Sequence, residues 1–245
     1  MIQHYKFSIE NQDHKAVPSF LAYRLYAALL EQMPEEIGTR AHEQGYSGIS
    51  QYLAFDRENQ KSIWHISLLG DEEAAWGQAV LPMMQSIALH EMPLSVQLLE
   101  AGTAMSAESL LAQAARLDDV SKIKLTFHTV TSFKSQGAYQ IFPSTELILH
   151  SLMQKWNACF PDMLLEDEDA FQMLCQGVQI REYRLKSARY KLKKTSIPGF
   201  VGELELAARL ADPMMEIWKL LLTFAPFCGI GIKTALGMGG VEFDT

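Results

Sequence analysis

The chain has 245 residues, of which 48% are hydrophobic, so it can bury an ordinary globular core and is not expected to be disordered. It has no apolar run of the roughly 18 residues that a membrane span needs, and its start, MIQHYKFSIENQDHK, lacks the apolar segment of a secretory signal. We therefore expect a cytoplasmic protein with no membrane association, whose three widely spaced cysteines form neither a disulfide framework nor a CxxC metal site.

The first half of the chain shows the hydrophobic periodicity of a βαββαβ unit. We expect a strand near 3–10 and then a helix near 18–32 that carries Leu21, Leu25 and Leu29 on one stripe. A short helix from Pro34 to Gly45 follows, and strands near 48–55 and 62–69 come next. A helix from Asp71 to about Gln85 and a strand near 94–101 complete the unit.

The second half repeats this order. The second βαββαβ unit begins with the strand KIKLTFHTV and a helix from Ser144 to about Ala158. Strands near 178–193 and 199–208, a helix from Asp212 and a strand near 235–243 follow. Two such units predict an α+β protein with two tandem ferredoxin-like domains, residues 1–120 and 121–245. The segment from Ala104 to Asp119 is predicted to be an extra helix and linker.

Charge is distributed unevenly between these halves. The net charge of −8 at first argues against a nucleic-acid ligand, because affinity for phosphates depends largely on Lys and Arg. Residues 1–120, however, carry 7 basic and 16 acidic side chains, whereas residues 121–245 carry 14 and 13. The predicted strand IREYRLKSARYKLKK holds seven bases and a single acid, Glu182.

The segment CGIGIKTALGMGGVEF near the C-terminus is unusually rich in glycine. A loop of this kind can present a row of backbone N–H groups to phosphates, and a plain glycine-rich turn is the equally weighted alternative. It is not a P-loop, because Lys233 follows Ile232 rather than glycine, and it is not a dinucleotide-binding fingerprint, because Thr234 stands where the third glycine belongs.

The pattern GxGxxxxxGxG in the last strand region of such a two-domain chain resembles the glycine-rich signature of the Cas6 family of CRISPR-associated endoribonucleases. Its glycines here are Gly229, Gly231, Gly237 and Gly239. The segments LTFHTVTSFKSQGAYQIFPSTELILHSLMQKWN, IPGFVGELEL and WHISLLGDEE are also similar to family segments, in the expected order. The layout is closest to members associated with type III systems.

The resemblance implies binding of precursor CRISPR RNA and its cleavage within the repeat. The 2'-OH would attack the adjacent phosphorus and give a 2',3'-cyclic phosphate and a 5'-hydroxyl. It also implies no cofactor and no metal, which agrees with the lack of HExxH and CxxC motifs in the sequence. Transfer of the product to a CRISPR effector complex and homodimer formation are further expectations.

The resemblance also suggests catalytic residues. His42 matches the family's catalytic histidine in the short helix, and in the last turn the helix dipole would favour its protonated form. Tyr26 is the candidate for the family's tyrosine, with Tyr23 one turn earlier, although either tyrosine could simply be a core residue. The family's lysine after the histidine is missing from EQGYSGISQY, so we expect Lys233 or a base of the basic strand to stabilise the transition state.

We expect the basic strand to bind the phosphate backbone of the repeat RNA. Alternation would place Arg189, Lys191 and Lys193 on one face and Tyr190 and Leu192 on the other. An edge strand guarded by charge is the alternative interpretation. The residues assigned to RNA binding are Arg181, Arg184, Lys186, Arg189, Lys191, Lys193 and Lys194 of this strand, together with Gly229, Gly231, Gly237 and Gly239 of the glycine-rich loop.

Two other functions are open at this point. The same fold could bind repeat RNA as a scaffold without cutting it, and this alternative is favoured by the absence of a lysine shortly after His42. A small-molecule sensor built on paired ferredoxin-like domains is the third class, but it would not need so basic a strand.

Overall fold

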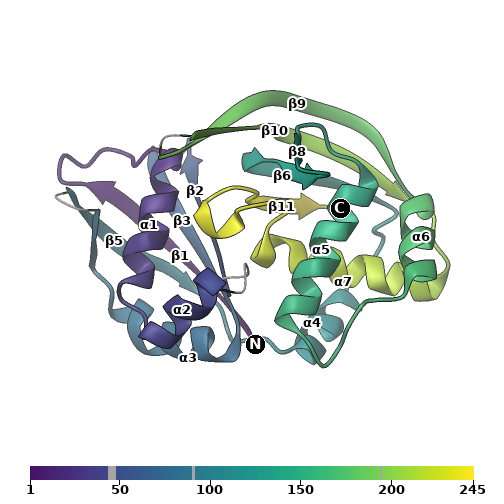
Figure 1. The fold of residues 1–245 in the computed structure, drawn as a ribbon, viewed down its shortest axis with the longest axis horizontal. Helices are drawn as coiled ribbons and strands as arrows, with labels where there is room; N and C mark the ends of the chain where they lie inside the picture. Colours follow the sequence, from purple (N-terminus) through teal and green to yellow (C-terminus); the bar gives the residue numbers. More distant parts are fainter. Residues whose placement is uncertain (44–47, 90–91, 194) are drawn as a thin grey trace. The chain divides into compact units, whose positions relative to one another are not determined.

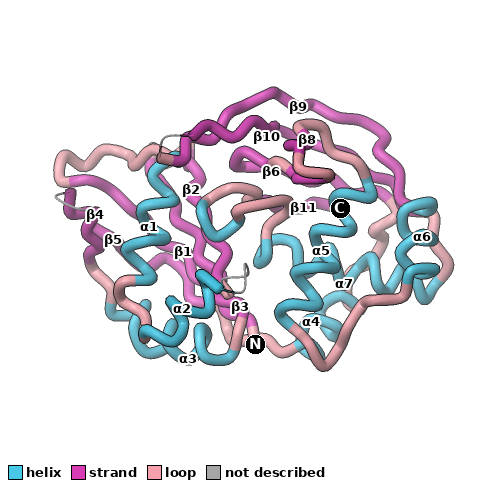
Figure 2. Tube along the Cα trace, in the orientation of Figure 1, coloured by secondary structure: helices cyan, strands magenta, loops and turns pink. Residues whose placement is uncertain are grey.

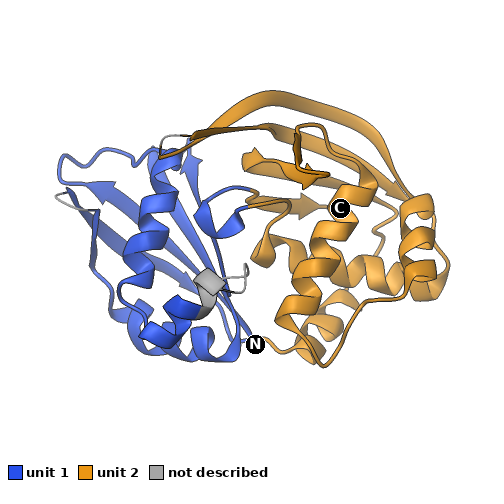
Figure 3. Cartoon of the chain, in the orientation of Figure 1, with its two compact units in different colours: residues 1–104, 233–238 blue, residues 105–232, 239–245 orange. Residues whose placement is uncertain are grey.

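The computed structural model describes residues 1–43, 48–89, 92–193 and 195–245, and for residues 40–43 it describes the backbone alone (Figure 1). The chain forms two compact units (Figure 3). Unit 1 comprises Met1–Ala104 and Lys233–Met238, and unit 2 comprises Met105–Ile232 and Gly239–Thr245.

Unit 1 contains the elements of its continuous stretch and a late 3-10 turn. They are β1 (Ile2–Asn11), η1 (Ser19–Leu21), α1 (Ala22–Leu30), α2 (Glu35–Glu43), β2 (Ile49–Asp56), β3 (Lys61–Leu69), α3 (Asp71–Val80), η2 (Leu81–Met83), β4 (Ser86–Leu89), β5 (Met92–Ala101) and η3 (Thr234–Leu236).

The sheet of unit 1 has the strand order β2-β3-β1-β5-β4, with antiparallel neighbours throughout. Without the short edge strand β4, this is the order of a ferredoxin-like sheet. Leu25 and Leu29 of α1 pack into one core with Phe7 and Trp64, which the 3.6-residue stripe predicted. The helix predicted to reach Gln85 ends at Val80, because Pro82 has no N–H to continue an α-helix and a 3-10 turn replaces it.

Unit 2 contains the remaining helices and strands. They are α4 (Ala107–Ala114), β6 (Lys122–Thr131), β7 (Phe133–Ser135), β8 (Ala138–Gln140), α5 (Thr145–Cys159), α6 (Glu168–Gly177), β9 (Val178–Leu192), β10 (Thr195–Ala208), α7 (Asp212–Cys228) and β11 (Val241–Asp244). The main sheet has the order β11-β6-β10-β9, and β7 pairs with β8 in a separate hairpin. Figure 2 shows the long strands β9 and β10 side by side.

The core of unit 2 lies between this sheet and helices α5 and α7. Trp156 packs edge to face on Phe224, with ring centroids 5.5 Å apart, and Phe127 packs in the same way on Phe200. Both units thus have the ferredoxin-like order, which confirms the predicted fold class. The final strand was predicted from residue 235, but it begins at Val241, because η3 occupies part of that stretch.

The division between the units differs from the predicted boundary near residue 121. It falls after Ala104, because α4 packs against α7 and so belongs to unit 2. Helix α6 was not predicted, although Asp167 caps its start by accepting the Ala170 N–H at 2.8 Å. Among the described residues, no helix is long and apolar enough to cross a membrane.

Candidate functional site

The helix predicted to carry His42 is present. Helix α2 runs over Glu35–Glu43, with Glu35 and Glu36 in its first turn, where the helix dipole favours carboxylates. His42 therefore lies in the last turn of α2, while its side chain lies outside the described residues. Its catalytic role stays a prediction from the sequence.

Tyr26 projects from α1 and is half-buried against the hydrophobic core of unit 1. One turn earlier, Tyr23 is engaged by its neighbour, because the Arg24 Nε donates to the Tyr23 hydroxyl at 3.1 Å. Arg24 also lies over the ring of Tyr23, 5.8 Å from its centroid. Tyr26 thus combines packing with partial access to solvent, which leaves its assisting role open to test.

The glycine-rich loop needs its glycines for shape. Gly229, Gly231, Gly237 and Gly239 have φ of 67°, 86°, 99° and 71°, a region that other residues rarely adopt. A Cβ on Gly231 would lie 2.4 Å from the carbonyl oxygen of Ser132. Gly231 therefore makes a close approach that a residue with a Cβ could not make at low cost, and the other three glycines have a backbone conformation that favours glycine.

These glycines do not offer a row of free N–H groups to phosphates, contrary to our prediction. Their N–H groups donate to the carbonyl of Ala225 at 2.9 Å, the hydroxyl of Ser151 at 2.8 Å, and the carbonyls of Thr234 and Val130 at 3.4 and 3.1 Å. All four glycines are buried. Because a buried N–H needs a partner, the protein itself satisfies them. The four glycine N–H groups therefore support the shape of the loop, while contact of the loop with RNA stays a prediction from the sequence.

Helix α5 holds this loop through two residues that sequence reasoning missed. The Ser151 hydroxyl accepts the Gly231 N–H, and the Lys155 ammonium donates to the carbonyls of Gly229 and Gly231, both at 2.9 Å. Ser151 and Lys155 are four residues apart and share one face of the helix. The available signal was a serine and a lysine among the buried apolar positions of α5.

Burial lowers the pKa of Lys155 to about 8, since the ammonium is removed from water, and the neighbouring Cys228 opposes this shift. Between pH 8 and the ordinary value of 10.5, the unfolded chain binds more protons at this lysine than the folded chain. The free energy of unfolding should therefore rise with pH through this window because of Lys155.

We expect Lys155→Met to remove this rise, which amounts to roughly 1–2 kcal/mol by pH 9.5. Urea denaturation at pH 7.5 and 9.5 of the parent, of Lys155→Met and of the exposed-lysine control Lys134→Met would measure it. The comparison must be with the parent, because burial raises the pKa of Cys228 and of Tyr5 to about 12, which lowers stability at high pH. An equal pH dependence in the parent and Lys155→Met would contradict the assignment.

Lys233 lies in the part of the loop that belongs to unit 1. It is exposed, has a left-handed backbone with φ of 57°, and its carbonyl accepts the Leu236 N–H at 2.9 Å. The following turn η3 contacts β2 and also α1, the helix of Tyr26. The fold thus brings the elements of these two candidate residues together.

Gln51 fixes this arrangement and was also missed. Its buried side-chain amide donates to the carbonyl of Ala235 in η3 at 2.7 Å and to that of Ala22 at 2.9 Å. Its oxygen accepts the Trp64 Nε1–H at 2.8 Å. A fully satisfied buried amide is a rigid, directional joint, so it sets the position of the backbone next to Lys233.

The basic strand β9 is the outer strand of the unit 2 sheet. No ion pair links its bases to another residue within 1–43, 48–89, 92–193 and 195–245. The exposed bases are Arg181, Arg184, Lys186, Arg189, Lys191 and Lys193, while Lys194 lies outside the described residues. Exposed, unpaired cations are available to a polyanion.

The Arg and Lys residues of β9 do not all lie on one face of the strand. Arg189 and Lys191 lie opposite the buried Tyr190, as predicted, but Arg184 and Lys186 have the register of Tyr190. Lys193 has left the strand and occupies the β9–β10 turn, with φ of 51°. The positive charge therefore surrounds the edge of the sheet.

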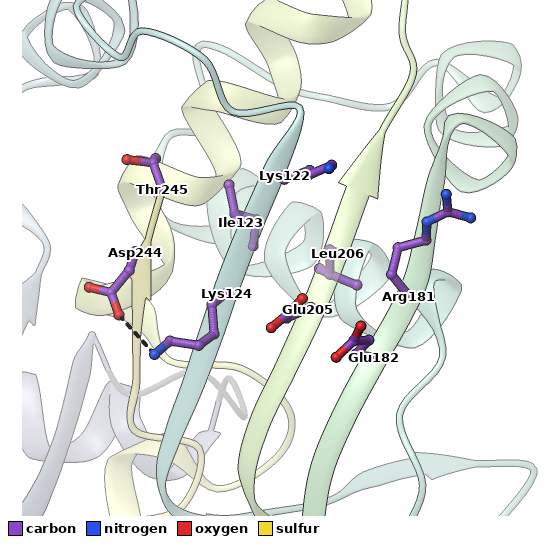
Figure 4. Close-up of a pocket in the computed structure, with 9 residues that line it drawn as sticks. All are labelled: Lys122, Ile123, Lys124, Arg181, Glu182, Glu205, Leu206, Asp244 and Thr245. Carbon is purple, nitrogen blue, oxygen red and sulfur yellow. Dashed lines mark ion pairs between the residues drawn. The ribbon is translucent and has the colours of Figure 1, made fainter.

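The sheet face that carries Lys124 has mixed charge. A shallow pocket of about 450 Å³ lies there (Figure 4). Lys124 Nζ lies 3.7 Å from the carboxylate of Asp244 and 3.8 Å from that of Glu203. The pocket is lined by Lys122, Ile123, Lys124, Arg181, Glu182, Glu205, Leu206, Asp244 and Thr245. Its carboxylates would repel phosphates, so the edge strand β9 suits RNA better than this face does.

Comparison with known proteins shows what the chain resembles. A model of the family described as "CRISPR-associated endoribonuclease Cas6" matches residues 125–241. The Cas6 endoribonuclease of Streptococcus thermophilus is 31% identical over 239 residues, covering 97% of this chain and 96% of that protein. That of Mycobacterium tuberculosis is 29% identical over 231 residues, covering 91% and 71%.

Solved structures share the fold. A Cas6 product complex superposes with a TM-score of 0.80 at 21% identity, over 100% of both chains. Thermus thermophilus Cas6 gives 0.75 at 22% identity, over 100% of this chain and 98% of that one. Because the likeness to the Streptococcus thermophilus protein spans nearly the whole of both sequences, this chain belongs to the Cas6 family of CRISPR-associated endoribonucleases.

Proposed function

We propose that this protein cleaves precursor CRISPR RNA within the repeat by a metal-independent reaction. The 2'-hydroxyl would attack the adjacent phosphorus and expel the 5'-oxygen, giving a 2',3'-cyclic phosphate and a 5'-hydroxyl. The observation that carries the proposal is the near full-length likeness to a Cas6 endoribonuclease. The exposed Arg and Lys side chains of β9 support it, because they form no ion pair with another described residue and suit the phosphate backbone.

The proposed reaction needs three groups. His42 acts as general acid or base, Tyr26 assists it, and Lys233 neutralises charge on the phosphorane. Two observations support Lys233: it is exposed, and Gln51 fixes the turn that follows it. One of the structural neighbours is a Cas6 protein in which a histidine is replaced by alanine, with a TM-score of 0.74.

A scaffold that binds repeat RNA without cutting it is the second candidate. It is favoured by one observation, the absence of a basic residue in EQGYSGISQY after His42. The groups that bind RNA would be the same, so only chemistry separates the two candidates.

Cleavage of the cognate repeat RNA in EDTA tests the proposal. We expect the parent protein to cut, to leave a cyclic phosphate detectable by mass spectrometry, and to be blocked by a 2'-deoxy substitution at the cut site. Tight binding without cutting would move the protein to the scaffold function. Cutting that needs added Mg²⁺ would overturn the metal-independent mechanism.

A further inference from the structure

Two aromatic side chains are exposed beside the basic strand. Tyr183 of β9 is 59% exposed, and Phe142, in the loop before α5, is 54% exposed. Their ring centroids lie 5.4 Å apart with an angle of 84° between the planes. In this edge-to-face arrangement, the contact between the two rings does not cover the faces of the ring that presents its edge, and both rings are more than half exposed.

Tyr183 lies on the same face of β9 as two of the basic residues that are proposed to bind RNA, Arg189 and Lys191. From Glu182 to Leu192, β9 pairs with β10 without a register shift, so alternate side chains keep one face. The face of Tyr183 therefore also carries Ser187, Arg189 and Lys191, all exposed. Tyr183 and Arg189 are six residues apart, which is roughly 20 Å along a strand.

We propose that Phe142 and Tyr183 form a stacking platform for an unpaired base of the bound RNA, while Arg189 and Lys191 hold phosphates further along the same strand. This inference rests on the RNA binding proposed above and adds a second mode of contact to it. Every base has a π-face, so stacking on exposed aromatic rings, combined with a basic track, suits single-stranded RNA of varied sequence.

An RNA ligand fits this surface better than an apolar protein partner. A protein covering both rings would also desolvate neighbouring cations, which have no ion-pair partner among the described residues. The phosphates of an RNA strand neutralise the same cations while its bases cover the rings. The charge around the aromatic pair thus selects the polyanion.

Binding of the repeat RNA, made uncleavable by a 2'-deoxy substitution at the cut site, tests the platform. We expect the double variant Phe142→Leu, Tyr183→Leu to bind about tenfold more weakly at every salt concentration, since it loses stacking but no charge. Tyr183→Phe should bind like the parent, because stacking needs the ring and not the hydroxyl. The control Met173→Leu, on another exposed apolar residue of unit 2, should also bind like the parent.

Salt dependence separates stacking from electrostatics. Arg189→Gln with Lys191→Gln should flatten the slope of log K against log salt by about 0.7 for each phosphate that the protein no longer neutralises, whereas the leucine pair should leave the slope unchanged. A 2-aminopurine placed at the stacked position should be quenched by the parent and not by the leucine pair.

Three results would overturn the platform. The leucine pair could bind with parental affinity, could change the salt slope as the glutamine pair does, or could abolish a dimer of the parent seen in sedimentation while RNA affinity stays unchanged. The last result would mean that the rings contact a second copy of the chain. Failure of the parent protein itself to bind repeat RNA would instead contradict the proposed function.

Discussion

Replacing His42 by alanine is expected to slow cleavage of the repeat RNA by about 10²–10⁴-fold, the usual contribution of a general acid or base. The 2'-hydroxyl would no longer lose its proton to a positioned imidazole, or the leaving oxygen would no longer gain one. RNA affinity should stay within a factor of about two, because no phosphate contact is assigned to this residue. Single-turnover cleavage with excess protein, together with a binding isotherm, measures both quantities.

His14→Ala is the matched control for this variant. His14 also belongs to unit 1, its ring is exposed, and its Nδ1 lies 2.7 Å from Glu10 Oε1. We assign it no role in RNA binding or cleavage. It should cleave at the parental rate. A His42→Ala protein that cuts at the parental rate would remove His42 from the mechanism and transfer the acid–base role to another group.

Replacing Gly231 by alanine is expected to destabilise unit 2 by roughly 3 kcal/mol, which lowers Tm by about 5–12 °C. Two costs combine. Positive φ is unfavourable for alanine by about 1–2 kcal/mol, and the new Cβ would lie 2.4 Å from the Ser132 carbonyl oxygen. That oxygen cannot easily retreat, because it accepts the Ile232 N–H at 2.9 Å.

Gly137→Ala separates these two costs. Gly137 has a similar φ of 80°, but nothing lies within 4 Å of the position its Cβ would take. Its alanine variant should therefore show only the backbone cost, and the difference between the two variants measures the clash. Calorimetry of both variants and the parent gives the values. Equal losses at the two positions would mean that the loop yields to the added methyl group.

The sequence alone was sufficient to predict those parts of the fold that hydrophobic periodicity determines. The stripe of Leu21, Leu25 and Leu29 predicted a helix that packs on the sheet, and these leucines are buried in the structure. The alternation around Tyr190 predicted its burial between the exposed Arg189 and Lys191, although Arg184 and Lys186 of the same register are exposed. Both patterns are local, so the residues themselves carry the information.

The structure of the glycine-rich loop could not be predicted in this way, because it depends on contacts between residues far apart in the sequence. Gly231 and Ser151 are 80 positions apart, and Gln51 and Ala235 are 184 apart. No local pattern indicates that the N–H groups of the glycine signature have partners inside the protein. The prediction that these glycines present free N–H groups to phosphates was therefore reasonable from glycine chemistry and wrong because of tertiary contacts, whereas contact of the loop with RNA stays a prediction.

The late segment Lys233–Met238 gives unit 1 an unusual order of completion during synthesis. Residues 1–104 leave the ribosome well before Lys233–Met238, yet Gln51 finds its acceptor on Ala235 only after this late segment has been made. Domains usually fold as units while the chain emerges. Here the early part must wait with a buried amide lacking one partner, so a nascent chain stalled before residue 233 should expose an incomplete first unit to proteases and chaperones.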